Sequence, residues 1–240
     1  MIIIPDVHGR DFWRKAVEEN PGKKFIFLGD YLDPYPWEGI TVDQAWQGLQ
    51  DIVAFKKRNP GDVTLLWGNH DLHYIYPDLR GSRYDDWNAG RNAVFFEENK
   101  SLFKYAHEVV TDGGTRILFS HAGIGRKWIL GCFPALGEDE ITADLFNDLA
   151  DYGPFEQALC EVSYFRGGSY PYGSLLWADA REQTYPDNRL PGCIQVFGHT
   201  QMDAPDFMAG EFYCLDCRQA FSLDCSDGAI YYLEDGTRVE

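Results

Sequence analysis

The sequence has few basic residues and no long apolar run, and each shortage excludes a class of function. Lysine and arginine together number 21, against 38 aspartates and glutamates, so the formal net charge is −17. Duplex nucleic acid and anionic membrane surfaces attract a surplus of basic side chains, so we expect neither as a partner. No apolar run approaches the roughly 20 residues of a membrane-spanning helix. An anionic substrate would need a local positive charge, for which a bound cation is the natural source.

The pattern of a secreted, disulfide-bonded protein is also missing. The apolar residues 2–4 are stopped at once by Pro5-Asp6, without the basic and longer apolar segments of a signal peptide. The six cysteines are dispersed, and the CxxC spacing of Cys214 and Cys217 has no second pair at zinc-ribbon spacing. We therefore expect packed, reduced thiols in a cytoplasmic protein.

What the sequence does contain is a repeated order of a short apolar run, a small residue, and then aspartate or histidine. Such runs are typical of strands buried on both faces. Helical patterns lie between them, and Thr41 with Gln44 fits a capping box. The alternation predicts an α/β layered fold in a single domain over residues 1–240, with a helical and loop insertion at about 133–190. The predicted strands are 2–4, 25–28, 63–67, 117–119, 194–197, 211–215, 220–223 and 229–233, and the predicted helices are 11–20, 41–59, 92–107, 138–152 and 155–162.

Polar side chains collect directly after several of the predicted strands. Four of the six histidines lie there, together with three aspartates and an asparagine. Open α/β sheets place their sites at the carboxyl ends of strands, and imidazole with carboxylate is a ligand set for divalent metals. We therefore expect a metal site. The residues are His8, His70, His121, His199, Asp6, Asp30, Asp33 and Asn69.

Five motifs follow one another along the chain: Asp6-Val7-His8-Gly9, Gly29-Asp30-Tyr31-Leu32-Asp33, Gly68-Asn69-His70-Asp71, Ser120-His121-Ala122-Gly123 and Gly198-His199-Thr200. In this order they resemble the motifs of the calcineurin-like metallophosphoesterases. The nearest branch is the one that contains the PPP-type serine/threonine phosphatases and the bacterial diadenosine tetraphosphatases. Two further segments, Leu175-Leu176-Trp177-Ala178-Asp179 and Cys214-Leu215-Asp216, are similar to that branch, so the resemblance extends from residue 6 to about 216.

The resemblance implies a β-sandwich flanked by helices with a two-metal site. Asp6 and His8 would hold one metal, Asp30 would bridge both, and Asn69, His121 and His199 would hold the other. His70, oriented by Asp33, would protonate the leaving oxygen. Manganese is the first expectation for the two divalent ions, with iron, zinc, nickel and magnesium as the others. Two cations about 3.5–4 Å apart stabilise the attacking and leaving oxygens and generate hydroxide at neutral pH.

The sequence departs from the branch after Asp33. PPP-type phosphatases usually carry an arginine there that binds the phosphate, whereas this chain has Pro34. Arg181 is our first candidate for that role, and Arg166, Arg126 and Arg83 are further ones. Two histidines lie outside the motifs. His73, three residues after His70, could approach the site, but a loop or helix surface is the favoured interpretation, and His107 is expected to cap a helix end.

The function predicted from these residues is hydrolysis of phosphate monoesters by direct attack of a metal-bridging hydroxide, as in PPP-type phosphatases. The alternative is hydrolysis of a nucleotide or dinucleoside polyphosphate. The substrate would be a phosphorylated small molecule, a nucleotide or a phosphoprotein. A binding protein on a degenerate phosphoesterase fold would be expected to lack ligands that are present here. A structural metal site would have no use for a bridging Asp30 or for His70.

Overall fold

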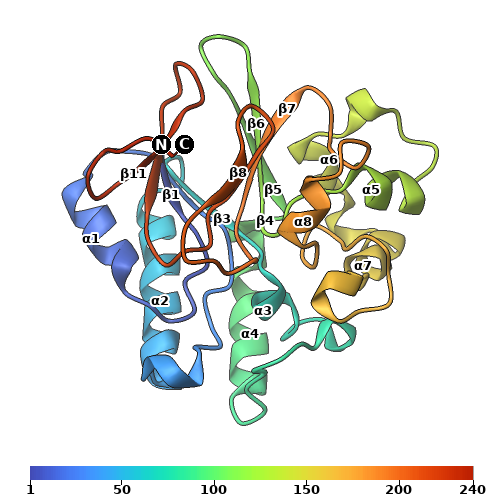
Figure 1. The fold of residues 1–240 in the computed structure, drawn as a ribbon. Helices are drawn as coiled ribbons and strands as arrows, with labels where there is room; N and C mark the ends of the chain where they lie inside the picture. The colour runs from blue at the N-terminus through green and yellow to red at the C-terminus, as the bar shows by residue number, and fades with distance from the viewer. Residues whose placement is uncertain (240) are drawn as a thin grey trace. The chain divides into compact units, whose positions relative to one another are not determined.

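The computed structural model describes residues 1–239, which divide into two compact units with one β-sheet each (Figure 1). The first unit comprises Met1–Lys104, Arg218–Leu223 and Ile230–Arg238. The second comprises Tyr105–Cys217, Asp224–Ala229 and Val239. The mixed α/β composition of both units confirms the predicted fold class, and the single domain stays a prediction. No helix of the described residues is long and apolar enough to cross a membrane.

The sheet of the first unit has six strands in the order β11-β10-β1-β2-β3-β4. Strands β1 to β4 are parallel, so their carboxyl ends lie at one edge of the sheet. Strands β10 and β11 add an antiparallel hairpin beside β1. The first two strands are buried throughout, as short apolar runs predict. The bounds are β1 (Ile2–Ile4), β2 (Phe25–Phe27), β3 (Val63–Leu66), β4 (Phe103–Lys104), β10 (Phe221–Leu223) and β11 (Ile230–Tyr232).

Helices of the first unit begin and end largely where the sequence predicts. The capping box at α2 is formed, because Thr41 Oγ1 accepts from the Gln44 N–H at 3.2 Å and Gln44 Oε1 accepts from the Thr41 N–H at 2.8 Å. Helix α2 packs against β3. The helical elements are α1 (Phe12–Glu19), η1 (Pro36–Glu38), α2 (Val42–Arg58), α3 (Asn69–Leu72), η2 (Pro77–Leu79), α4 (Ala89–Asn99) and η3 (Lys100–Leu102).

The predicted helix over residues 92–107 is wrong in its second half. Helix α4 ends at Asn99, and the chain enters β4 and then β5 (Ala106–Val110). His107 therefore pairs with Phe119 in a strand instead of capping a helix. Strand pairing outweighs the helical spacing here, because β5 ends in two β-branched valines that suit a sheet.

The sheet of the second unit has five strands in the order β5-β6-β7-β9-β8. Its three central strands are parallel, and both edge strands are antiparallel to their neighbours. The carboxyl ends of β6 and β7 therefore lie side by side. The bounds are β6 (Arg116–Ser120), β7 (Cys193–Phe197), β8 (Asp206–Met208) and β9 (Phe212–Cys214).

Residues 133–190 form short helices and loops, as predicted for the insertion, but the helix over 138–152 is broken into three. Thr142 is extended, and its side chain accepts from the Leu145 N–H, so a new helix begins there. The Asn147 amide then holds α6 to the edge strand by a 3.0 Å bond to Ala106 O. The elements are α5 (Arg126–Cys132), η4 (Glu138–Glu140), α6 (Ala143–Asp148), η5 (Leu149–Asp151), α7 (Gly153–Leu159), η6 (Tyr164–Arg166) and α8 (Ala180–Gln183).

Candidate metal centre

Asp6, His8 and Asp30 form a buried cluster at the carboxyl ends of β1 and β2. Each offers one ligand atom, and these atoms all lie within 4.8 Å of one another. The turn after β1 is tied to the turn after β2, because the N–H groups of Val7 and His8 both donate to Asp30 O. Parallel strands therefore bring together the polar residues that follow them. Two carboxylates and an imidazole fit a divalent metal.

The His8 ring presents a suitable atom to such a metal. Its Nδ1 lies 2.9 Å from Leu32 O, which can only accept, so Nδ1 carries the proton and Nε2 is left with a lone pair. This Nε2 lies 3.4 Å from Asp30 Oδ2. Burial lowers the pKa of His8 to about 3, although the nearby Asp30 acts to raise it. The low pKa keeps the imidazole neutral and able to bind a cation.

Two glycines allow the ends of β2 and β3 to approach. Gly29 has φ +104°, and a Cβ there would lie 2.6 Å from Gly68 N. A Cβ on Gly68 would lie 2.2 Å from Asp30 Oδ1. Since neither contact is tolerable, the glycines of both motifs are required for the position of Asp30.

Asp71 fixes the backbone of Asp30, a role that the sequence analysis did not assign. Its carboxylate accepts from the N–H groups of Asp30 at 2.8 Å, Tyr31 at 3.0 Å and Gly68 at 2.8 Å. Burial and the nearby Asp30 raise the pKa of Asp71 well above its usual range. Asp71 in the third motif therefore supports the position of Asp30.

His70 lies on α3 with its Nδ1 2.8 Å from Asp33 Oδ2. His73 Nε2 lies 2.8 Å from the same oxygen, and the Tyr74 hydroxyl donates to Asp33 Oδ1. Burial would raise the pKa of Asp33, but its interactions with the His70 and His73 imidazoles outweigh burial and lower it. The ionised carboxylate therefore lies where it can hold the His70 ring in one orientation.

The prediction for His73 is wrong, because its side chain is fully buried beside Asp33. Helix α3 is a single turn, and a spacing of three residues puts His73 on the same side as His70. The His-x-x-His spacing directly after a strand is the sequence pattern that indicates a position of His73 near His70.

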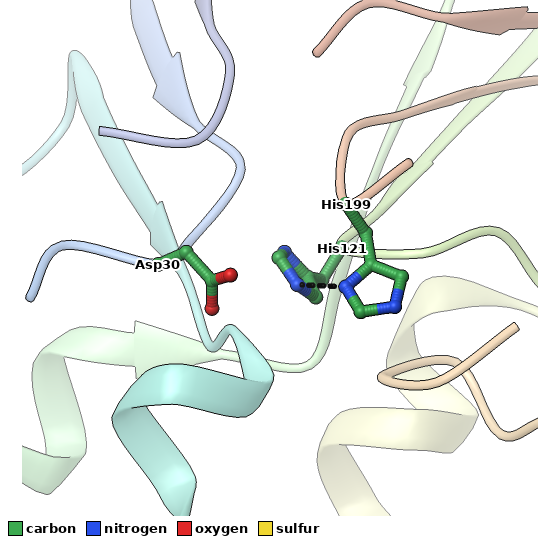
Figure 2. A group of neighbouring side chains, drawn as sticks. All are labelled: Asp30, His121 and His199. Carbon is green, nitrogen blue, oxygen red and sulfur yellow. Dashed lines mark hydrogen bonds between the residues drawn. The ribbon is translucent and has the colours of Figure 1, made fainter. Parts of the chain in front are cut away.

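In the second unit His121 follows β6 and His199 follows β7. Figure 2 shows the two imidazoles beside each other, with His121 Nε2 and His199 Nδ1 3.1 Å apart. Both residues are buried. Two imidazoles so arranged can serve as neighbouring ligands of one cation.

Strained backbone is concentrated at the predicted residues. Within residues 1–239, six non-glycine residues have positive φ, and four of them belong to the predicted metal-site residues. Such conformations are costly and persist where the surrounding structure enforces them, often at functional sites. The four are His8, Asp30, Asp33 and His199, and the other two are Arg83 and Arg218.

The candidate phosphate-binding arginines have very different surroundings. Arg181 is 60% exposed in its side chain and forms an ion pair with Asp179 at 2.6 Å, and Arg126 forms one with Glu138. Arg166 Nη2 donates to His199 O at 3.3 Å. Arg83 Nη2 lies 2.9 Å from His70 Nε2. Of these four, only Arg166 and Arg83 contact a predicted site residue within their own unit.

Comparison with known proteins agrees with these motifs. A family model described as calcineurin-like phosphoesterase matches residues 2–203. The serine/threonine-protein phosphatase 6 catalytic subunit of Drosophila melanogaster is 24% identical over 250 residues, which cover 99% of this chain and 67% of that protein. A serine/threonine phosphatase structure from Saccharomyces cerevisiae, described as similar to human phosphatase PP5, has a TM-score of 0.51 at 15% identity and covers 100% of this chain and 76% of its own. The chain belongs to the calcineurin-like phosphoesterase family and is a hydrolase of phosphoric esters.

Proposed function

We propose that the protein hydrolyses phosphate monoesters with two divalent metal ions, in the manner of PPP-type phosphatases. Asp6 and His8 would bind one ion, and Asp30 would bind both ions. The observation that supports this most directly is the buried cluster of Asp6, His8 and Asp30 in the same unit as the His70–Asp33 pair. The ligands of the second ion would be Asn69, His121 and His199.

Metal ions bound here would lower the pKa of water and neutralise charge on the phosphate, so that water attacks phosphorus directly. The chain itself supplies a proton donor. Because Asp33 accepts from His70 Nδ1, the opposite atom, Nε2, is the one that would deliver a proton to the leaving oxygen. Asp33 stabilises the orientation of that imidazole.

The first experiment is hydrolysis of p-nitrophenyl phosphate by chelator-treated protein, with manganese, nickel, zinc, iron or magnesium restored singly. We expect turnover only with metal, highest with manganese, and two bound ions per chain by elemental analysis. Two bound ions without cleavage of any ester would instead support a binding protein on this fold.

A second candidate, hydrolysis of dinucleoside polyphosphates, is favoured by the segment after Asp33. The rings of Tyr35 and Trp37 lie 4.8 Å apart, and Trp37 is 73% exposed, so a base could stack there. Comparing a phosphopeptide with a dinucleoside tetraphosphate distinguishes the two candidates. Trp37→Ala should raise the Michaelis constant for the dinucleotide alone if the second is correct.

A further inference from the structure

The Arg83 guanidinium contacts two histidines of the candidate site and one aromatic ring, none of which carries a negative charge. Its Nη2 lies 2.9 Å from His70 Nε2 and 3.4 Å from His8 Nε2. Its Cζ lies 3.6 Å from the centre of the Tyr35 ring, so the guanidinium is stacked on that ring. The guanidinium therefore lies next to two imidazole nitrogens and one aromatic face.

In the described part of the chain, no carboxylate pairs with Arg83. Its Nη1 is buried and makes no hydrogen bond. Burying a charged donor without a partner is costly, so such a group calls for a physical explanation. Other arginines of this acidic chain do have carboxylate partners. The pairs are Arg10–Glu38, Arg14–Asp51, Arg80–Asp86, Arg116–Glu108, Arg126–Glu138, Arg181–Asp179 and Arg189–Glu211.

The loop around Arg83 is anchored in this position. The Tyr84 ring stacks on Tyr74 at 4.9 Å, and the Asp85 N–H donates to the Tyr74 hydroxyl at 3.1 Å. Tyr74 donates in turn to Asp33. Arg83 itself has φ +60°, and His8, Asp30 and Asp33 likewise have positive φ, which is a strained conformation for residues other than glycine. The carboxylate that orients His70 thus also anchors the loop that carries Arg83, so the guanidinium is preorganised.

We propose that Arg83 binds the phosphate group of the substrate, in place of the arginine that this chain lacks after Asp33. Guanidinium groups bind phosphate oxygens with two parallel N–H donors, and in the described residues Nη1 of Arg83 has no hydrogen-bond partner. The segment after Asp33 does not bind the phosphate itself but helps to position Arg83. Pro34 cannot donate a hydrogen bond, but the next residue, Tyr35, supplies the ring that positions Arg83.

The proposal rests on the proposed function only for the identity of the anion, so binding and turnover are measured separately. Inorganic phosphate is titrated calorimetrically into metal-loaded protein, and KM and kcat are measured with p-nitrophenyl phosphate. We expect Arg83→Ala to weaken phosphate binding and raise KM by roughly 10- to 100-fold, with two metal ions still bound. Arg83→Lys should recover only part of the affinity, and added guanidinium ion should partly restore binding by Arg83→Ala.

The matched control is Arg80→Ala, because Arg80 lies on the same loop but forms an exposed ion pair with Asp86. It should change phosphate affinity by less than about twofold. The proposal is overturned if Arg83→Ala binds phosphate as the native protein does, if metal-loaded native protein binds no phosphate, or if the loss in Arg83→Ala follows entirely from loss of metal. Phosphate binding that depends on Arg83, without cleavage of any ester, would support this site and contradict the proposed function.

Discussion

The hydroxyl of Tyr74 donates a hydrogen bond to Asp33, and this contact joins two parts of the candidate site. On one side, Asp33 orients His70 through Nδ1. On the other, Tyr74 accepts the Asp85 N–H from the loop that carries Arg83. Burial and Asp33 raise the pKa of Tyr74 far above its ordinary value, so the phenol keeps its proton and remains a donor. One side chain therefore couples the proposed proton donor to the proposed phosphate ligand.

Tyr74→Phe tests this coupling. The variant keeps the stacked ring but removes the hydrogen bonds of the hydroxyl with Asp33 and Asp85, so we expect it to lose about 1–3 kcal/mol of unfolding free energy in urea. The Michaelis constant for p-nitrophenyl phosphate should rise as well, because the Arg83 loop loses its anchor. Tyr76→Phe is the control, since within residues 1–239 the Tyr76 hydroxyl makes a single long hydrogen bond, accepted from Lys100 Nζ at 3.5 Å. Equal effects of the two variants would contradict the coupling.

Asp33→Asn should reduce stability in a pH-dependent way. The pKa of Asp33 is lower in the folded protein than its ordinary value near 4, so its ionised form stabilises the fold above that value. This stabilisation is lost as the pH falls through the lowered pKa. The difference in unfolding free energy between native protein and Asp33→Asn should therefore be largest near neutral pH and shrink below about pH 4. A difference that does not change with pH would argue against an ionised Asp33.

Much of the candidate site could be predicted from sequence because its residues follow buried strands. Asp6, Asp30 and His121 each lie one or two residues beyond a short apolar run, and parallel pairing brings such positions to one edge of a sheet. The capping box at Thr41 was equally predictable, since it depends on residues three apart. Local patterns of this kind suffice where local and tertiary preferences agree.

Features that depend on distant contacts were not predictable in this way. Nothing near Arg83 in the sequence indicates that its guanidinium stacks on Tyr35, which lies 48 positions earlier. His73 was assigned to a surface because no apolar run directly precedes it, whereas the single turn of α3 buries it against Asp33. The strand at residues 106–110 was missed because pairing with β6 decides its conformation.

Asp30→Asn should abolish turnover. Replacing one carboxylate oxygen by an amide removes the charge that would hold both cations, while the side chain keeps its size. We expect metal content to fall and kcat to drop by about 1,000-fold or more. Asp43→Asn, an exposed position in the first turn of α2, is the control. Full activity of Asp30→Asn would exclude the bridging role.

His70→Asn separates proton donation from metal binding. A poor leaving group such as an alkoxide needs a proton in the transition state, whereas p-nitrophenolate leaves without one. We expect kcat to fall by roughly 100-fold or more for an alkyl phosphate, and by much less for p-nitrophenyl phosphate, with both metal ions still bound. His107→Asn, in a strand of the second unit, is the matched control and should lower both rates little. If His70→Asn lowered both rates equally, His70 would act on a step other than departure of the leaving group, since only that step distinguishes the two substrates.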